Sequence, residues 1–173
     1  THYDLDHSGG LPYLLSRIGT KYIFLPYAED PYGMEAILRG KTDGEVFTVK
    51  EDILLSFGGA HITIFAPVSY NSGNESSMCV LFQTENCDIL VTGDRSAKTE
   101  QMLLSRRELP QLDVLVAGHH GSKTSTCSQL LAATMPEHVF ISVGADNSYG
   151  HPAQDLLRRL LEYGCIICRT DEN

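Results

Sequence analysis

Short apolar runs alternate with longer amphipathic segments in the second half of the chain, and this alternation constrains the fold more than any other feature. Strand-type runs are "CDILVTGD", "LDVLVAG", "HVFISVG" and "CIICRT", and the segments between them have helical spacing. The first half is dominated by strand-like runs, among them "KYIFLP", "EVFTVKE", "HITIFAP" and "SMCVLFQ". Such a chain folds into layers in which helices cover sheet faces. The sequence therefore predicts an α/β fold, with one domain over residues 1–173.

Two local signals fix parts of this pattern. The segment "PAQDLLRRLLEYG" predicts a helix that begins near Pro152 and ends at Gly164. Its leucines at 156, 157, 160 and 161 form one apolar stripe, which we expect to face a sheet. "SMCVLFQ" and "CDILVTGD" are expected to form a hairpin around residues 84–86.

Composition excludes several classes of protein. The formal net charge of −9 argues against nucleic-acid binding through a basic face, but not against a nuclease whose positive charge comes from bound metal ions. The chain has no apolar run of about 18 residues, so no membrane-spanning segment is expected. The five cysteines lack the spacing of a disulfide framework, and Cys165 and Cys168 should point to opposite faces of a strand. We expect reduced thiols.

The opening segment "THYDLDHSGG" places His2, Asp4, Asp6 and His7 within six positions. If it is the end of a strand before a Gly-Gly turn, His2, Asp4 and Asp6 share one face, and the turn brings His7 to them. Imidazole and carboxylate groups together suit Zn²⁺, Mn²⁺ or Fe²⁺ better than Ca²⁺. A polar turn that happens to contain two histidines is the alternative, but the density of ligand-type residues favours a metal site.

Two later strands also end in residues with metal-binding or acid–base chemistry. The strand in "ILVTGD" is followed by Asp94, although a lone aspartate there is usually a helix cap or turn residue. The strand in "VLVAGHHGS" is followed by His119 and His120. Because adjacent side chains point in different directions, we expect one of them to bind metal and the other to orient a ligand or the substrate.

A third strand of this kind leads into the polar loop "SVGADNSYGHP", which carries Asn147, Tyr149 and His151. A single histidine before a helix is often only a cap. Here it follows a strand end equivalent to the others, which favours a role in the same site.

Together these motifs resemble the metallo-β-lactamase superfamily, which pairs an HxHxDH motif with a later bridging aspartate and a later histidine. Here the first motif reads HxDxDH, with Asp4 where the second histidine usually stands. This variant, followed by "VTGD", "GHHGSKTS" and "YGHP…RTDEN", is similar to the C-terminal domain of the ComEC/Rec2 DNA-internalisation proteins. The similarity covers the whole chain and is strongest over residues 88–173. Phosphorylcholine esterases of the superfamily share the HxDxDH variant and the HHGS block.

The resemblance implies an αββα sandwich of the metallo-β-lactamase type that lacks its first N-terminal strands, because several strands precede the first motif in the superfamily. It also implies a parent protein in the bacterial cell membrane with a channel domain, whereas the fragment itself should be soluble. With strands missing, "KYIFLP" and "HITIFAP" should be exposed. We therefore expect a dimer formed through the N-terminal half.

Two divalent ions, zinc or manganese, are implied as cofactors. The superfamily's usual third ligand to the first ion, a histidine before the strand of "VTGD", has no match. The stretch "NESSMCV" offers Asn74, Ser76 or Ser77 instead, and His61 is expected to be structural. The ligands implied are Asp6, His7 and His120 for one ion, His2 and Asp4 for the other, and Asp94 as the bridge.

The implied function is metal-dependent hydrolysis of a phosphodiester, with nuclease activity on DNA during uptake favoured. Asp94 would act at the catalytic centre, and His119 or His151 would protonate the leaving oxygen. The alternatives are a phosphorylcholine esterase or another hydrolase of this fold, and a non-catalytic DNA-handling module. The absence of tryptophan argues against an aromatic choline cage. The expected substrate contacts are Ser122, Lys123, Asn147 and Tyr149.

Overall fold

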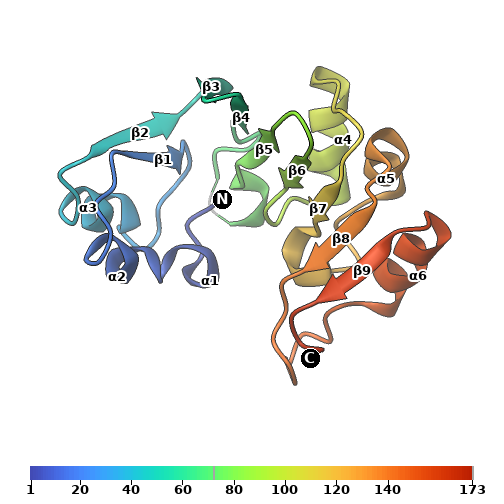
Figure 1. Ribbon diagram of the computed structural model, residues 1–173. Coiled ribbons are helices and arrows are strands. Elements are labelled where there is room, and N and C mark those ends of the chain that lie inside the picture. The colour runs from blue at the N-terminus through green and yellow to red at the C-terminus, as the bar shows by residue number, and fades with distance from the viewer. Residues whose placement is uncertain (72, 173) are drawn as a thin grey trace.

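The computed structural model describes residues 1–71 and 73–172 of the chain, and Figure 1 shows how its elements are arranged. The helices are α1 (Leu5–Ser8), α2 (Leu11–Leu15), α3 (Met34–Arg39), α4 (Ala97–Arg106), α5 (Ser128–Thr134) and α6 (Gln154–Glu162), with 3₁₀ turns η1 (Asn74–Ser76) and η2 (Gly118–Gly121). The strands are β1 (Tyr22–Pro26), β2 (Glu45–Val49), β3 (Ile53–Phe57), β4 (Ala60–Phe65), β5 (Cys79–Gln83), β6 (Asp88–Val91), β7 (Val114–Val116), β8 (His138–Ile141) and β9 (Ile166–Arg169).

A seven-stranded sheet with the order β3-β4-β5-β6-β7-β8-β9 forms the centre of the molecule. Strands β3 to β6 pair antiparallel, as successive hairpins do, whereas β6 to β9 pair parallel through helical crossovers. In the parallel half Leu90 pairs with Leu115, and Leu115 with Val139. The carboxyl ends of β6, β7 and β8 therefore meet at one edge of the sheet.

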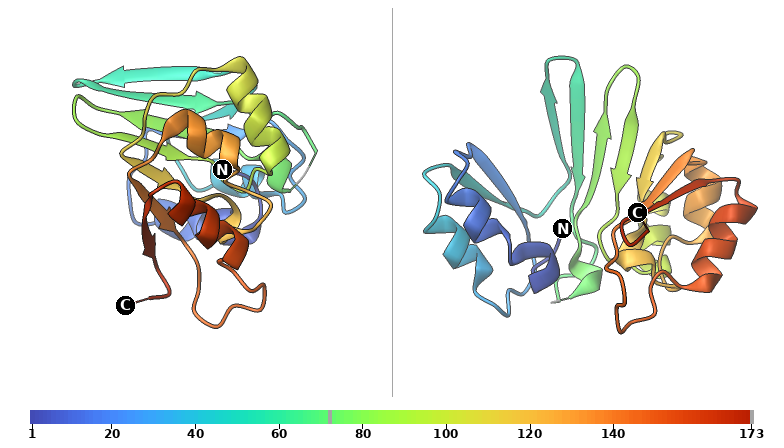
Figure 2. Two further views of the ribbon diagram at one scale, coloured as in Figure 1. Left: turned by 90° about the vertical axis from the view of Figure 1, so that its right-hand side faces the viewer. Right: turned by 60° about the horizontal axis from the view of Figure 1, so that its bottom comes forward.

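Helices α4, α5 and α6 cover one face of this sheet (Figure 2). The paired residues Leu90, Leu115 and Val139 are fully buried in the main core. From the helices, Leu103, Leu130, Leu131, Leu156 and Leu160 complete this core. The stripe expected on α6 is confirmed for Leu156 and Leu160, and Leu157 packs against the same core, whereas Leu161 is exposed.

The N-terminal lobe is built around a two-stranded parallel sheet, β1-β2, which packs with α2 and α3. Its core contains Tyr3, Leu25, Met34 and Leu38. A third cluster joins the lobe to the large sheet, since Val49 of β2 packs with Ile64 of β4. Helices thus lie outside two sheets that pack on each other, and the predicted αββα layering is confirmed.

Three local expectations differ from the structure. The opening segment is helical at residues 5–8 rather than the end of a strand. Strand β3, which was not among the predicted strands, forms one edge of the large sheet. Because β3 pairs with β4, the run "HITIFAP" is an interior strand and not an exposed one, whereas "KYIFLP" pairs only with β2 among the described residues.

Within residues 1–71 and 73–172, no helix combines the length and the apolar character needed to cross a membrane. All five cysteines are free thiols. Cys165 is buried just before β9, and Cys168 is half-buried within it.

Candidate metal centre

The opening segment reaches the edge of the large sheet as one helical turn rather than as a strand. Asp4 is the N-cap residue of α1, and its carbonyl accepts hydrogen bonds from the backbone of His7 and Ser8, both at 2.9 Å. The buried Tyr3 anchors the segment, since its hydroxyl donates to the Pro26 carbonyl at 3.1 Å. This turn directs His7 inward and leaves the Asp6 side chain 62% exposed.

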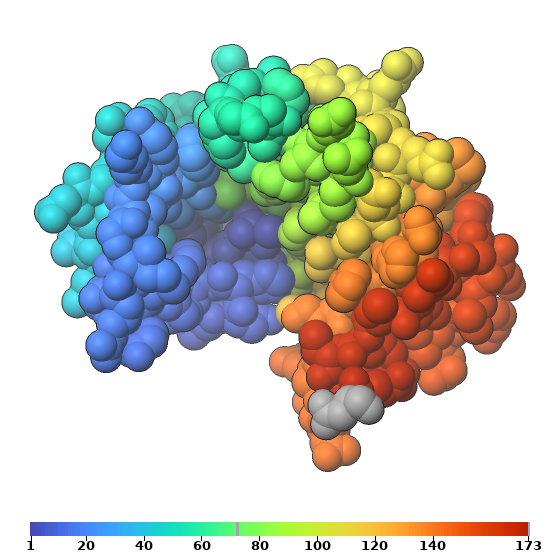
Figure 3. Space-filling model, viewed as in Figure 1, coloured from blue at the N-terminus to red at the C-terminus, as the bar shows by residue number. Residues whose placement is uncertain are grey.

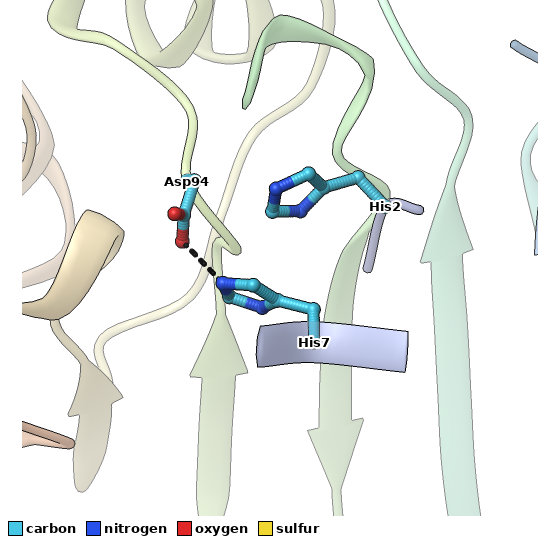
Figure 4. A group of neighbouring side chains, drawn as sticks. All are labelled: His2, His7 and Asp94. Carbon is cyan, nitrogen blue, oxygen red and sulfur yellow. Dashed lines mark ion pairs between the residues drawn. The ribbon is translucent and has the colours of Figure 1, made fainter. Parts of the chain in front are cut away.

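Donor atoms from distant parts of the chain converge on His7 (Figure 4). Its Nε2 lies 3.3 Å from Asp94 Oδ1 and 3.2 Å from His120 Nε2. Asp6 Oδ2 lies 3.7 Å from the same nitrogen and 3.2 Å from His120 Nε2. Two overlapping triads result, His2, His7 and Asp94, and Asp6, His7 and His120. The structure therefore brings residues 2–7, Asp94 and His120 to one place.

His2 lies beneath this cluster and is only 3% exposed. Its Nδ1 is 3.1 Å from Ser77 Oγ, and its Nε2 is 3.4 Å from Asp4 Oδ2. The contact with Asp4 lacks the geometry of a hydrogen bond, so this buried Nε2 has no hydrogen-bond partner among the described residues. A buried imidazole nitrogen with no partner is costly unless something binds it, so His2 presents a free ligand atom to the centre.

Asp94 follows β6 through a turn that only glycine suits. Gly93 has φ +62°, and a Cβ added there would lie 2.8 Å from the Cβ atoms of Ser77 and Thr1. The Asp94 amide donates to Ser77 Oγ at 3.0 Å. Ser77 thus contacts both His2 and Asp94. It lies in the stretch "NESSMCV", which corresponds to the superfamily's third ligand, and its hydroxyl holds His2 and Asp94 in place.

The tandem histidines have strained backbones. His119 and His120 have φ of 51° and 52°, in the left-handed region that non-glycine residues rarely adopt, at a cost of about 1–3 kcal/mol each. His120 Nδ1 lies 2.8 Å from the Ser142 carbonyl, which can only accept, so this nitrogen carries the proton. The tautomer leaves a lone pair on Nε2, which is the atom that faces Asp6 and His7. Such a carbonyl partner is typical of metal-binding histidines.

These contacts test whether the residues suit a divalent metal ion. The His120 Nε2 lone pair and the Asp6 carboxylate oxygen lie 3.2 Å apart, and two acceptors at that distance repel unless a cation lies between them. A cation would also bind the Nε2 of His2, which has no hydrogen-bond partner among the described residues. A set of imidazole nitrogens and carboxylate oxygens suits zinc, manganese or iron. The residues therefore fit the ions that the motifs imply.

The pKa values of this cluster reflect burial and mutual charge. Burial lowers the pKa of His7, but the hydrogen bond and charge of Asp94 outweigh it and raise the pKa overall. For Asp94 burial raises the pKa, and the contact with His7 reverses this to a lowered pKa. The pKa of His2 is lowered by burial and by nearby His7. The contact between His7 and Asp94 thus shifts both pKa values in the direction that favours the charged forms.

A cleft of about 790 Å³ opens over the cluster, and Figure 3 shows the hollow between the blue N-terminal segment and the orange loop after β8. His119 lines it, with Nε2 3.8 Å from Asp94 Oδ2, and so do His151 and Tyr149. Burial lowers the pKa of His151, and the nearby His119 and His120 lower it further. Both candidate proton donors therefore lie beside the metal ligands, although their roles stay predictions.

Of the four expected substrate contacts, the structure places two in the cleft. Asn147 lines it, but its amide is used to brace the loop, donating to the Gly144 and His151 carbonyls at 3.0 and 2.6 Å. Ser122 is buried and hydrogen-bonded to Thr124 Oγ1 at 2.9 Å, and neither Ser122 nor Lys123 is among the described residues that line the cleft. A substrate contact by these two stays a prediction.

The structure also places the residues whose roles the sequence left open. Asn74 lies at the cleft with its amide nitrogen 3.4 Å from the His119 ring, so it contacts a site residue, whereas Ser77 supports the ligands. His61 pairs with Gln83, which pairs with Asp88 at the start of β6. It therefore lies at the opposite end of the sheet from Asp94, as expected for a structural residue. The support from the Ser142 carbonyl was missed, because a backbone group leaves no signal in the sequence.

Comparison with known proteins agrees with this geometry. The family model described as "Metallo-beta-lactamase superfamily" matches residues 1–144. ComE operon protein 3 of Bacillus subtilis is 29% identical over 178 residues, covering 100% of this chain and 23% of the relative. Recombination protein 2 of Haemophilus influenzae is 32% identical over 172 residues, covering 98% of this chain and 20% of the relative. The predicted similarity to ComEC/Rec2 competence proteins is confirmed, and the chain spans about a fifth of their length.

Solved structures show the same fold at low sequence identity. The metallo-beta-lactamase fold protein YhfI from Bacillus subtilis aligns with a TM-score of 0.61 at 13% identity, over 100% of this chain and 73% of its own. CmlA, a diiron beta-hydroxylase from Streptomyces venezuelae, aligns with a TM-score of 0.54 at 12% identity, over 88% of this chain and 44% of its own. Sequence match and architecture agree. The chain belongs to the metallo-beta-lactamase superfamily.

Proposed function

We propose that this chain is a metal-dependent phosphodiester hydrolase that acts on DNA as part of a longer DNA-uptake protein. The observation that carries the proposal is the convergence of His2, Asp6, His7, Asp94 and His120 donor atoms at the base of an open cleft. The similarity to a recombination protein and to competence proteins supports DNA as the phosphodiester. The formal net charge of −9 means that a polyanion would need bound cations at this site.

The ligand atoms divide between two divalent ions, for which zinc and manganese are the candidates. Because one Nε2 binds one ion, we assign His7 to the ion held with Asp6 and His120, and His2 with Asp4 to the other. Asp94 lies between the two groups of ligands, since its Oδ2 is 3.8 Å from His120 Nε2 and the residue also forms a triad with His2 and His7. This suits a bridging ligand. Bound ions would supply Lewis acidity and lower the pKa of a water molecule.

The chain's own residues then have distinct tasks. Asp6, His7 and His120 fix the position of the phosphorus from the floor of the cleft. His119 and His151 line the cleft beside them, and one of the two donates a proton to the leaving oxygen. His119 Nε2 is 3.8 Å from Asp94 Oδ2, whereas Nδ1 of His151 is buried and has no hydrogen-bond partner within residues 1–71 and 73–172. His119 is the better placed of the two.

A non-catalytic DNA-handling module is the second candidate, and one observation favours it. Ser77, a neutral hydroxyl, lies where the superfamily's third ligand to the first ion was sought, and its oxygen already accepts from the Asp94 amide. The first ion is therefore held by fewer strong ligands than in the usual pattern. If it exchanges readily, hydrolysis would be slow while the fold and any DNA contact persist.

Metal analysis combined with a phosphodiesterase assay tests the proposal. The chain loaded with Zn²⁺ or Mn²⁺ should retain about two ions after gel filtration and should hydrolyse bis(p-nitrophenyl) phosphate and DNA. Asp94→Asn should lose both the bound metal and hydrolysis, because it removes one of two carboxylate oxygens that the ligands share.

Asp43→Asn is the matched control, since Asp43 is exposed in the segment between α3 and β2. Full hydrolysis in Asp94→Asn would contradict the assignment of the centre. Tight binding of two ions without any phosphodiester hydrolysis would instead favour the non-catalytic role.

A further inference from the structure

Tyr149 lies at the edge of the cleft in a position that the proposed hydrolysis does not use. The side chain is 82% exposed, although the residue lines the cleft above the candidate metal centre. One side of its ring faces His151, with ring centroids 6.0 Å apart and an interplanar angle of 21°. The exposure of 82% leaves most of the ring free to stack with a flat ligand in the cleft.

The loop that carries Tyr149 is braced rather than loose. His151 donates its amide to Asn147 Oδ1 at 3.0 Å, and Asn147 Nδ2 donates to the His151 carbonyl at 2.6 Å. At the base of the loop, the Ala153 amide donates to the Gly121 carbonyl at 2.9 Å. Gly121 allows this close approach, since a Cβ there would lie 2.7 Å from Pro152 Cβ. His151, against which the Tyr149 ring stacks, is therefore held in place before any ligand arrives.

The rings of His151 and His119 lie between Tyr149 and the ligands of the centre. His151 is 5.8 Å from His119, centroid to centroid, and His119 Nε2 is 3.8 Å from Asp94 Oδ2. Tyr149 and the ligands Asp6, Asp94 and His120 line the same cleft. A base stacked on Tyr149 would therefore belong to the same strand as a phosphate at the metal ligands.

A choline headgroup would use the site differently. A quaternary ammonium ion is bound by several aromatic faces that enclose it. Tyr32 and Tyr149 are the tyrosines among the described cleft residues, and both are exposed rather than closed into a cage. A single exposed ring suits a flat ligand, and base–aromatic stacking tolerates any base.

We infer that Tyr149, supported by His151, is a stacking platform for an unpaired nucleobase of the strand that is hydrolysed. The inference rests on the proposed function and adds how the substrate is recognised. Stacking on one aromatic ring changes affinity by about 5- to 150-fold. It should therefore appear as a preference for nucleotides over the same backbone without bases.

The test compares an oligothymidylate of about eight nucleotides with an abasic strand of the same length and charge. The wild-type chain loaded with Mn²⁺ should have the higher kcat/KM for the thymidylate. Tyr149→Ala should reduce this preference by at least about fivefold while leaving the abasic rate unchanged. Tyr149→Phe should retain the preference. Tyr163→Ala, an exposed tyrosine at the end of α6, is the control and should behave as wild type.

A second readout separates this inference from the proposed function. Binding of phosphorothioate versions of the two strands, followed by fluorescence anisotropy, reports stacking even if no strand is hydrolysed. Equal binding and equal rates for the two strands in the wild type would overturn the platform while leaving hydrolysis intact. Retention of the preference in Tyr149→Ala would overturn it too. Competition by phosphorylcholine that depends on Tyr149 would show a cation site instead.

Discussion

Replacement of Glu100 by alanine is expected to destabilise the loop that carries the tandem histidines. Glu100 is a charged residue of α4 with 0% exposure, and it lies outside the cleft. Its Oε1 accepts from the Thr126 amide at 2.6 Å, and its Oε2 from the Cys127 amide at 2.8 Å. Arg159 binds the other side of the same turn, donating to the Ser125 and Thr126 carbonyls at 3.1 and 2.8 Å.

The turn transmits this support to the metal ligands. Thr126 has φ +52°, and its hydroxyl oxygen accepts from the Gly118 amide at 2.9 Å, directly before His119. Each hydrogen bond to a charged group contributes about 1.5–3 kcal/mol, and each buried amide left unpaired costs about 1–3 kcal/mol. Loss of both bonds to Glu100 should therefore cost about 3–6 kcal/mol. This is a large part of a typical stability of about 5–15 kcal/mol.

Urea unfolding followed by circular dichroism measures the loss, with Glu108→Ala, an exposed glutamate beyond α4, as the control. Because the strained backbones of His119 and His120 depend on this turn, the Mn²⁺ affinity of folded Glu100→Ala should fall as well. A destabilisation below about 1 kcal/mol would refute the reasoning, since that is less than one unpaired amide costs. Unchanged Mn²⁺ affinity would show that the turn and the histidines are not coupled.

Three further expectations follow from other parts of the molecule. Gly93→Ala should destabilise the fold by more than about 1 kcal/mol and weaken metal binding, because the added Cβ would lie 2.8 Å from Ser77 Cβ. Gly19→Ala, with open space around it, is the control. Equal urea unfolding midpoints for the two variants would contradict this expectation. Burial raises the pKa of Cys79 to about 12, so its thiol should not react with Ellman's reagent at pH 8 in the folded chain. The half-buried thiols of Cys87 and Cys168 should react. Rapid labelling of Cys79 in the native state would count against this expectation. The chain is expected to self-associate through its N-terminal half, where Tyr22, Phe47 and Leu54 are exposed. Sedimentation should show dimers or larger species, and Leu54→Lys should reduce their amount. A clean wild-type monomer would show that these faces do not associate.

The layered fold was predictable because the periodicity of this sequence is strong where the core lies. The leucines of α6 and the apolar runs of β6, β7 and β8 mark buried faces, and the structure buries Leu90, Leu115 and Leu156 completely. Strand β3 was missed because "ILLSF" lies on the sheet edge with Leu54 and Phe57 exposed, so burial imposes no clear alternation on it. The opening segment was misassigned because one helical turn is too short for periodicity to distinguish it from a strand end.

One contact between residues of the site could be predicted without knowing the full fold. The hairpin expected around residues 84–86 is confirmed, and its register pairs Val80 with Val91. Extending that register by three residues brings Ser77 opposite Asp94, so this contact could have been derived from the sequence. The contact between His120 and the Ser142 carbonyl could not, since it depends on the left-handed backbone of two histidines, which no side-chain pattern indicates.

The site lies where the large sheet changes from antiparallel to parallel pairing, and this position explains how so many ligands can meet. Strand β6 is antiparallel to β5 and parallel to β7. The antiparallel partner brings the start of β5, with Ser77, beside the end of β6, with Asp94. The parallel neighbours bring the ends of β7 and β8, with His120 and the Ser142 carbonyl, to the same edge. The opening segment joins them there because the Met78 amide donates to the Thr1 carbonyl at 2.8 Å. An all-parallel or all-antiparallel sheet would give this edge only one of the two kinds of neighbour, so the change of pairing at β6 determines where a centre with these ligands can form.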